Sequence, residues 1–168
     1  MRIIIALCLM LFLLAYPACA WEARVVSVAD GDTITVEPER GGDRVKIRLH
    51  GIDAPERKQP YGQSARGFVH NVSLYKRVEI DTKVKDRYGR TVAVVTVPGG
   101  VLQEMLLDAG LAWVYPQYCK DTFCGAWERK QSVARKARKG LWADPDPVPP
   151  WEWRRAKKNN QQQRIAEE

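Results

Sequence analysis

The chain has 168 residues, 45% of them hydrophobic, and a formal net charge of +7 at pH 7. This length suffices for one domain of ordinary size with its own hydrophobic core. The excess of Lys and Arg favours polyanionic partners, such as nucleic acid, lipid headgroups or acidic glycans, although it also suits a merely soluble surface.

The first 20 residues have the pattern of a secretory signal peptide. Arg2 supplies one positive charge, an apolar run covers residues 3–16, and small residues end the segment at Ala18 and Ala20. The apolar run is short for a membrane span. The alternatives to a cleaved signal peptide are an uncleaved membrane anchor and a lipid attached to Cys19. We therefore expect a secreted or periplasmic protein that has no stable membrane span once this segment is removed.

Alternation of apolar and polar residues predicts five strands. Two lie within residues 25–36, on either side of a tight turn at 29–32, and the third covers 44–50 after a turn at 39–43. The fourth covers 78–84 with the same alternation. The fifth is a β-branched run at 91–97, which a Pro-Gly-Gly sequence ends.

Three stretches have the spacing of helices, at 65–72, 102–109 and 126–137, and Gly110 and Gly140 end the second and the third. The outer side of the third stretch is basic, which usually means only a solvated helix face. Early strands with about three packed helices predict an α+β fold, mainly β, built on a five-stranded OB-fold barrel, a fold that commonly binds nucleic acid.

We expect the domain to cover residues 21–150. From Asp144 the chain becomes rich in proline and then carries Trp151 and Trp153, which should strap back onto the domain. The polar C-terminal tail, residues 151–168, has almost no apolar residues beyond 153 and is expected to be disordered.

Four cysteines are present, and Cys8 and Cys19 fall within the expected signal peptide. The other two, Cys119 and Cys124, lie close together in sequence, which in an oxidising compartment favours a short disulfide loop. Zinc is the alternative, but two thiolates supply half of a tetrahedral site and the two histidines lie far away in sequence.

Three polar clusters carry the chemistry, and they lie at residues 30–33 (Asp-Gly-Asp-Thr), 48–56 (Arg-Leu-His-Gly-Ile-Asp-Ala-Pro-Glu) and 86–90 (Asp-Arg-Tyr-Gly-Arg). Carboxylates gather a hard cation, and arginines hold a phosphate through paired N–H donors. Cleavage of a phosphodiester requires both, so the clusters together indicate a metal-dependent nuclease. Alone, Asp-Gly-Asp is also a good turn sequence and Tyr-Gly-Arg a hairpin fragment.

Asp32, Asp53 and a backbone carbonyl would form an oxygen-only site for a hard cation. Pro55 stiffens the turn that carries Asp53 and Glu56, so both carboxylates can be aimed at one point. Calcium fits best because it tolerates irregular coordination shells, and magnesium is the alternative. A transition metal is disfavoured because the histidines show no ligand spacing.

In this order and at these intervals, the clusters resemble the staphylococcal nuclease (thermonuclease) family. The resemblance runs from about Val25 to Trp142 and includes later landmarks at 110–115 and 140–142. It implies an OB-fold barrel, a single calcium ion, DNA and RNA as substrates, and products with 3′-phosphate ends. The segment after Glu56 is shorter than the mobile loop of the founding member, so substrate range and rate can differ.

The resemblance also assigns roles to individual residues. The phosphate would be held by Arg48 and Arg90, and Glu56 would act as the general base or orient the attacking water. The metal ligands would be Asp32, Asp53 and the carbonyl of Ala54. The substrate-binding residues would be Arg87, Tyr88, Trp113 and Tyr115.

We therefore expect a monomeric, calcium-dependent endonuclease with low sequence specificity. The alternative is a non-catalytic OB-fold module that binds nucleic acid, but such a module should lack at least one of Arg48, Glu56 and Arg90, and all three are present. A third interpretation, a cell-surface polyanion binder that uses the basic side chains of residues 129–139, gives the carboxylates no role.

Overall fold

The computed structural model describes residues 20–167, so the expected signal peptide lies almost entirely outside the described residues. Within residues 20–167, no helix is both long enough and apolar enough to cross a membrane.

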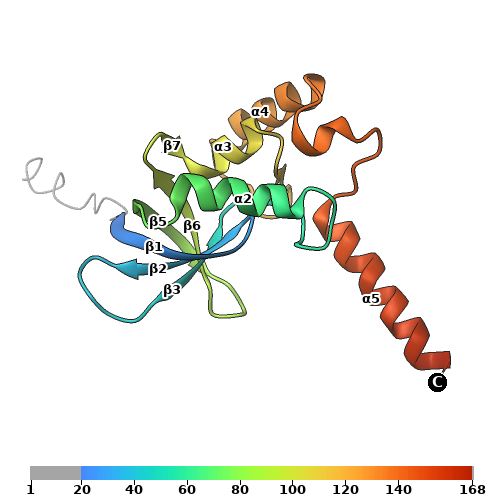
Figure 1. The fold of residues 1–168 in the computed structure, drawn as a ribbon, viewed down its shortest axis with the longest axis horizontal. Helices are drawn as coiled ribbons and strands as arrows, with labels where there is room; N and C mark the ends of the chain where they lie inside the picture. Colours follow the sequence, from blue (N-terminus) through green and yellow to red (C-terminus); the bar gives the residue numbers. More distant parts are fainter. Residues whose placement is uncertain (1–19, 168) are drawn as a thin grey trace, which may run out of the picture.

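The core of the fold is a closed five-stranded barrel (Figure 1). Its strands, in the order in which they are hydrogen-bonded, are β3 (Val45–Leu49), β2 (Thr33–Pro38), β1 (Trp21–Asp30), β5 (Arg77–Lys85) and β6 (Thr91–Val97). A parallel pairing of β3 with β6 closes the barrel, with Ile47 opposite Thr91. All five predicted strands are present, and the predicted OB-fold is confirmed.

Residues that alternate along the strands fill the barrel. Ile34, Ile47 and Ile80 are completely buried, whereas Lys46 and Glu79, each next to one of them in sequence, face solvent. This is the period of two that the sequence predicted, and it aims the opposite face of β3, including Arg48, away from the apolar core.

The helices cover the barrel (Figure 1). Helix α2 (Gly62–Ser73) contacts β1, whereas α3 (Leu102–Asp108) contacts β6, the short strand β7 (Gly100–Val101) and α4 (Cys124–Lys136). A 3-10 helix, η2 (Gly140–Ala143), packs against α4. Apolar residues at helical spacing bury one face of each helix, which is why the three predicted helices form where expected.

A second, two-stranded ladder positions the acidic residues. Strand β4 (Ile52–Asp53) pairs with β8 (Trp113–Val114), which places Asp53 opposite Trp113. Gly51 makes the turn between β3 and β4 with φ 70, and a Cβ there would lie 3.0 Å from Cys119 Sγ. The turn therefore requires glycine both for its left-handed backbone and for its close packing.

The C-terminal tail was predicted to be disordered, and this prediction is wrong. Residues Pro150–Glu167 form helix α5, which begins against the domain and extends away from it (Figure 1). Proline suits the first position of a helix, and the residues that follow are mainly Arg, Lys, Gln and Glu, which are good helix formers without being apolar. Low hydropathy showed that the segment has no core, but not that it is unstructured.

Candidate active site

Arg48 joins two of the three polar clusters. Its Nη2 donates a hydrogen bond to Asp53 Oδ1 at 2.8 Å, and its Nη1 lies 3.2 Å from Asp32 Oδ2. The register of the barrel explains the meeting, because Thr33 on β2 pairs with Arg48 on β3 and brings the end of the first turn beside the guanidinium. Both carboxylates are nearly or fully buried, so the pairing with Arg48 is strong and directional.

The turn between β1 and β2 packs against the loop that follows β4. Asp32 Oδ1 accepts a hydrogen bond from the Thr33 hydroxyl at 2.9 Å, and Asp32 Oδ2 accepts one from the Ala54 N–H at 3.1 Å. A Cβ on Gly31 would lie 2.7 Å from the Ala54 Cβ, so only glycine allows this approach. The three predicted metal-ligand residues, Asp32, Asp53 and Ala54, therefore lie together.

Asp30 belongs to the same acidic group, although it was not predicted as a metal ligand. Its Oδ1 is buried and has no hydrogen-bond partner among the described residues. Burial, and then the nearby charges of Asp32 and Glu56, raise the pKa of Asp30 to about 6, although the neighbouring Thr33 side chain and the Arg48 charge act in the opposite direction. Sequence could have suggested this residue only because it is the other half of Asp-Gly-Asp.

Glu56 lies on a tight loop between β4 and α2. Its N–H donates to Gln59 Oε1 at 3.2 Å, and its carbonyl accepts from the Gln59 N–H at 2.8 Å. These bonds hold the backbone of the loop, while the Glu56 carboxylate, 40% exposed, reaches the cleft.

The third cluster forms the turn between β5 and β6. Asp86 accepts hydrogen bonds from the backbone N–H groups of Tyr88 and Arg90, both at 2.9 Å, and a charged one from Arg90 Nε at 2.7 Å. Although burial acts in the opposite direction, these bonds lower the pKa of Asp86 below its ordinary value. Arg90 and Arg87 lie over the ring of Tyr88, 5.6 and 4.9 Å from its centre.

One cleft of about 740 Å³ gathers most of these side chains. The acidic residues Asp30, Asp32, Asp53 and Glu56 line it together with Arg48 and Arg90, which lie at the opposite end of the barrel strands from the turn at 39–43. The cleft also includes the expected substrate-binding residues Arg87, Tyr88 and Tyr115, but not Trp113.

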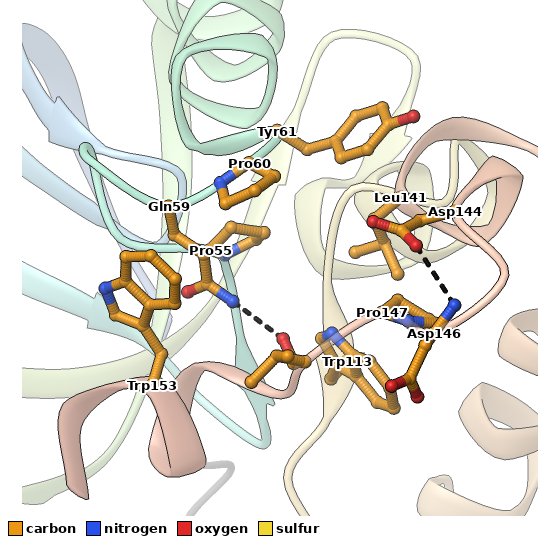
Figure 2. Close-up of a pocket in the computed structure, with 11 residues that line it drawn as sticks. Pro55, Gln59, Pro60, Tyr61, Trp113, Leu141, Asp144, Asp146, Pro147 and Trp153 are labelled. Atoms are coloured by element: carbon orange, nitrogen blue, oxygen red, sulfur yellow. Dashed lines mark hydrogen bonds between the residues drawn. The ribbon is translucent and has the colours of Figure 1, made fainter. Parts of the chain in front are cut away.

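Trp113 occupies a different position from the one expected of a substrate contact. It packs edge-to-face on Trp142, with ring centres 4.3 Å apart, and lines a small cavity of about 60 Å³ behind the cleft (Figure 2). Trp113 and Val114 form the short strand β8, and their side chains point to opposite faces of the ladder with β4. The Trp113 ring packs in the aromatic cluster with Trp142 and Trp151 and does not line the cleft.

The sequence did not predict Arg154, yet this residue lies at the centre of the site. Its Nη2 is 2.7 Å from Asp53 Oδ2, and its Nη1 is 2.8 Å from Glu56 Oε1. Burial alone would lower the pKa of Arg154, but the hydrogen bonds to Asp53 and Glu56 outweigh this effect, so the pKa is raised. Burial in turn raises the pKa of Asp53, against the effect of the Arg154 hydrogen bond and the Arg48 charge.

The donor set suits a hard cation. Asp32 and Asp53 offer oxygen atoms only, and the unpartnered Asp30 Oδ1 is a further buried oxygen beside them. Among residues 20–167, no group of three or more acidic, histidine or cysteine side chains is arranged to hold a metal ion. Asp53 and Glu56 are instead paired with Arg154. The oxygen donors themselves fit a hard cation such as calcium.

Cys119 and Cys124 form the predicted disulfide, with Cα atoms 5.7 Å apart. It closes the loop between β8 and α4, directly after Tyr115, and both cysteines are buried against the main core.

An acidic and arginine-lined cleft at the side of a closed OB-fold barrel defines a class of nucleic-acid-processing barrel proteins. The family profile "Staphylococcal nuclease homologue" matches residues 46–144. The chain belongs to the staphylococcal nuclease family, and this membership supports a nuclease function.

Curated relatives agree with this assignment. The chain is 43% identical over 152 residues to an "Uncharacterized endonuclease" of Escherichia coli, covering 89% of this chain and 96% of the relative. It is 39% identical over 157 residues to a "Micrococcal nuclease" of Shigella flexneri, covering 88% of each chain. A "Staphylococcal-like nuclease CAN1" of Arabidopsis thaliana is 41% identical over 115 residues, covering 68% of this chain and 35% of the relative.

Proposed function

We propose that the protein is a calcium-dependent endonuclease that hydrolyses phosphodiester bonds of DNA and RNA with low sequence specificity and leaves 3′-phosphate ends. The observation that carries this proposal is the meeting of Arg48, Glu56 and Arg90 with the acidic residues in one cleft. Family membership and the names of the relatives support it.

Asp32, Asp53 and the Ala54 carbonyl would hold the calcium ion. When bound, the ion draws charge from a phosphoryl oxygen and positions a water molecule. Arg48 already contacts both carboxylates, so its guanidinium is fixed in orientation before substrate arrives. Such fixed donors stabilise developing charge most effectively, because they need little reorganisation during the reaction.

Glu56 would take a proton from the attacking water as the water oxygen bonds to phosphorus. The bond from phosphorus to the 5′ oxygen would break, and the 5′ oxygen would leave as a hydroxyl with a proton from solvent, so the phosphate stays on the 3′ side. Proton transfer of this kind contributes a factor of roughly 10² to 10⁴. Arg90, held by Asp86, would contact the non-bridging oxygens together with Arg48. The residues proposed to hold the substrate contact phosphates and the faces of bases instead of base edges, which suits low sequence preference and single-stranded substrates.

We also propose that the protein is secreted or periplasmic and acts as a monomer. The charge and apolar run of residues 1–20 support export. Sequencing of the N-terminus of protein recovered from the culture medium or periplasm tests the first point, and sedimentation tests the second.

Digestion of plasmid and of single-stranded DNA, with calcium and then with a chelator, tests the main proposal. We expect cleavage that requires calcium and is faster on single strands, with products that a 3′-phosphatase makes extendable by a polymerase. Binding without any cleavage in calcium would favour the non-catalytic OB-fold module instead.

A further inference from the structure

We propose that the first turn of helix α5 is an internal competitor for the active site. Arg154 replaces the cation at Asp53 and Glu56, Trp151 covers the aromatic surface of Tyr115, and calcium and substrate bind fully only when this turn lifts. The inference rests on the proposed function, because it identifies the cleft as the site of calcium and of nucleic acid.

The contacts of Arg154 are those expected of a substitute cation. Asp53 is fully buried, and both of its oxygens accept hydrogen bonds from guanidinium groups: Oδ1 from Arg48 at 2.8 Å and from Arg154 at 3.3 Å, and Oδ2 from Arg154 at 2.7 Å. The same Arg154 reaches Glu56, the residue proposed to activate water. Arg154 occupies Asp53 Oδ2, the carboxylate oxygen that Arg48 does not bind, so a divalent ion that binds this oxygen must displace Arg154.

Trp151 makes the corresponding contact on the aromatic side of the cleft. Its ring stacks on Tyr115 with the planes 10° apart and the centres 5.0 Å apart, and it meets Trp113 edge-to-face at 5.8 Å. A parallel stack on an aromatic ring is also how single-stranded bases are commonly held by proteins. Trp151 therefore occupies the face of Tyr115 that a nucleobase would use.

The segment before α5 is anchored beside the site, which keeps this turn close to the carboxylates. Gln59 donates from Nε2 to the Val148 carbonyl at 2.6 Å, and Figure 2 shows the Trp153 ring beside the Gln59 and Pro55 side chains. Gln59 is also bonded to Glu56, so the anchor and the proposed base share one loop.

The rest of α5 adds little to this docking. In the described part of the helix, only Arg154 forms side-chain ion pairs or hydrogen bonds with the barrel domain, and the side chains from Arg155 to Ile165 are exposed. The Arg154 side chain itself is 42% exposed. Its ion pair with Glu56, whose side chain is 40% exposed, is weakened by water and salt, which helps the turn to lift without loss of the domain fold.

The competition should appear in the affinity for calcium. When the binding-competent form is a fraction of the population, the apparent Kd rises by the inverse of that fraction. If the turn is docked for about nine-tenths of the time, its release lowers the Kd for calcium about tenfold.

Calorimetric titration of the full chain with calcium chloride tests the role of Arg154. We expect Arg154→Ala to bind calcium about tenfold more tightly than the parent protein. Arg155→Ala is the matched control, because it removes the same charge from an exposed neighbouring position, and it should leave the Kd unchanged. Equal or weaker binding by Arg154→Ala would overturn the proposal and make Arg154 a supporting residue of the site.

The second experiment follows the turn directly, by NMR of the tryptophan indole N–H groups in the full chain, with Trp151→Phe used to assign the Trp151 signal. We expect saturating calcium to move the Trp151 signal to the position it has in Arg154→Ala. A Trp151 signal that stays in place while calorimetry records calcium binding would show that the ion and the docked turn coexist, which contradicts the proposal.

A third measurement addresses the substrate side. In the presence of a chelator, Trp151→Ala should bind fluorescent oligothymidylate more tightly than the parent protein does, as measured by fluorescence anisotropy. Weaker binding by this variant would contradict the proposal. These readouts are independent of catalysis. If the protein binds calcium as expected but cuts no nucleic acid, the proposed function is wrong, whereas the proposed competition between Arg154 and calcium still holds.

Discussion

Arg90 and Asp86 form an ion pair of 2.7 Å across the turn between β5 and β6, and the same carboxylate accepts the backbone N–H groups of Tyr88 and Arg90. The pair holds the Arg90 guanidinium at this turn, whereas Arg48 pairs with the buried carboxylates of the barrel. Asp86 is therefore a positioning residue for Arg90, because it fixes both the turn and the direction of the side chain.

Replacement of Asp86 by Ala should reduce turnover while the protein remains folded. Losing one preorganised charge contact on the phosphate costs up to about 3 kcal/mol, and a displaced Arg90 should lose part of that. We expect kcat to fall about tenfold to a hundredfold, measured on single-stranded DNA in calcium. Asp81→Ala, on strand β5 before this turn and outside the cleft, is the control and should keep its kcat.

The pKa of Asp86 gives the same interaction a pH signature. Because its folded-state pKa is lowered, the carboxylate stabilises the native state above its ordinary pKa near 3.8, and this contribution disappears as pH falls through the folded value. Carbon-detected NMR should show the pKa of Asp86 rising toward its ordinary value in Arg90→Ala. An unchanged titration in that variant would remove Arg90 as the partner.

Substitution of Arg48 by Lys tests the bridge between Asp32 and Asp53. Lysine carries the charge but not the planar fork, so it cannot bond both carboxylates at once. A poorly paired buried charge costs on the order of 3 kcal/mol, and we expect a loss of this size in the free energy of unfolding, with a loss of kcat of at least about a hundredfold. Urea unfolding and kcat together measure both effects.

Arg44→Lys is the matched control for Arg48, since it lies just before the same strand with a side chain that is 68% exposed. Surface substitutions of this type change stability by no more than about 0.5 kcal/mol. If Arg48→Lys behaved like Arg44→Lys in both measurements, the bridge would have no role in either stability or turnover.

Much of this arrangement was predictable from local sequence. Alternation in β3 placed Arg48 on the polar face, and the order of the three clusters indicated one cleft and one family. The cysteine spacing favoured the disulfide that forms between Cys119 and Cys124. These predictions succeeded because each depends on a period, a turn or a motif that a few neighbouring residues encode.

The features that the sequence did not indicate concern contacts between distant segments. Arg154 meets Glu56 across 98 positions and sits in a polar tail, where neither hydropathy nor motif spacing marks it. The orientation of Trp113 depends on the pairing of two-residue strands, which carry almost no periodicity. Disorder was predicted from low hydropathy, but helix propensity and one docked turn suffice to order α5.

Glu56→Gln should separate binding from catalysis. Glutamine keeps the size of the side chain and can still accept a hydrogen bond from Arg154, but it cannot take a proton from water. We expect kcat to fall by roughly 10² to 10⁴ while DNA binding in chelator stays within about twofold. Glu79→Gln, on the exposed face of β5, is the control. Full activity in Glu56→Gln would remove this residue from the mechanism.

The raised pKa of Asp30 predicts opposite effects of pH on stability and on calcium binding. Between pH 3.8 and about 6 the folded protein holds a proton that the unfolded chain releases, so Asp30 lowers the free energy of unfolding as pH rises through this range. Calcium affinity should increase over the same range, because the cation needs the ionised carboxylate. Thermal unfolding and calcium titration at pH 5 and pH 7 measure the two trends.

Asp30→Asn should reverse that balance at pH 7. Removing a carboxylate that is costly to ionise should stabilise the calcium-free protein by about 2 kcal/mol, and the variant should bind calcium more weakly than the parent. Asp43→Asn changes an exposed aspartate in the turn before β3 and serves as the control. A less stable Asp30→Asn protein would show that the carboxylate is not strained by its neighbours.

The disulfide should stabilise the fold without taking part in catalysis. Cys119 and Cys124 close a short loop, so their bond removes only a modest entropy from the unfolded chain, worth about 2 kcal/mol. The double variant Cys119→Ser with Cys124→Ser should therefore unfold at lower temperature but keep its kcat at temperatures well below the transition. The His50 imidazole bonded to Asp121 at 2.6 Å holds the same loop from the barrel side, and this contact should keep Tyr115 in place when the bond is absent. A loss of kcat in the fully folded double variant would show that the loop controls the aromatic side of the cleft.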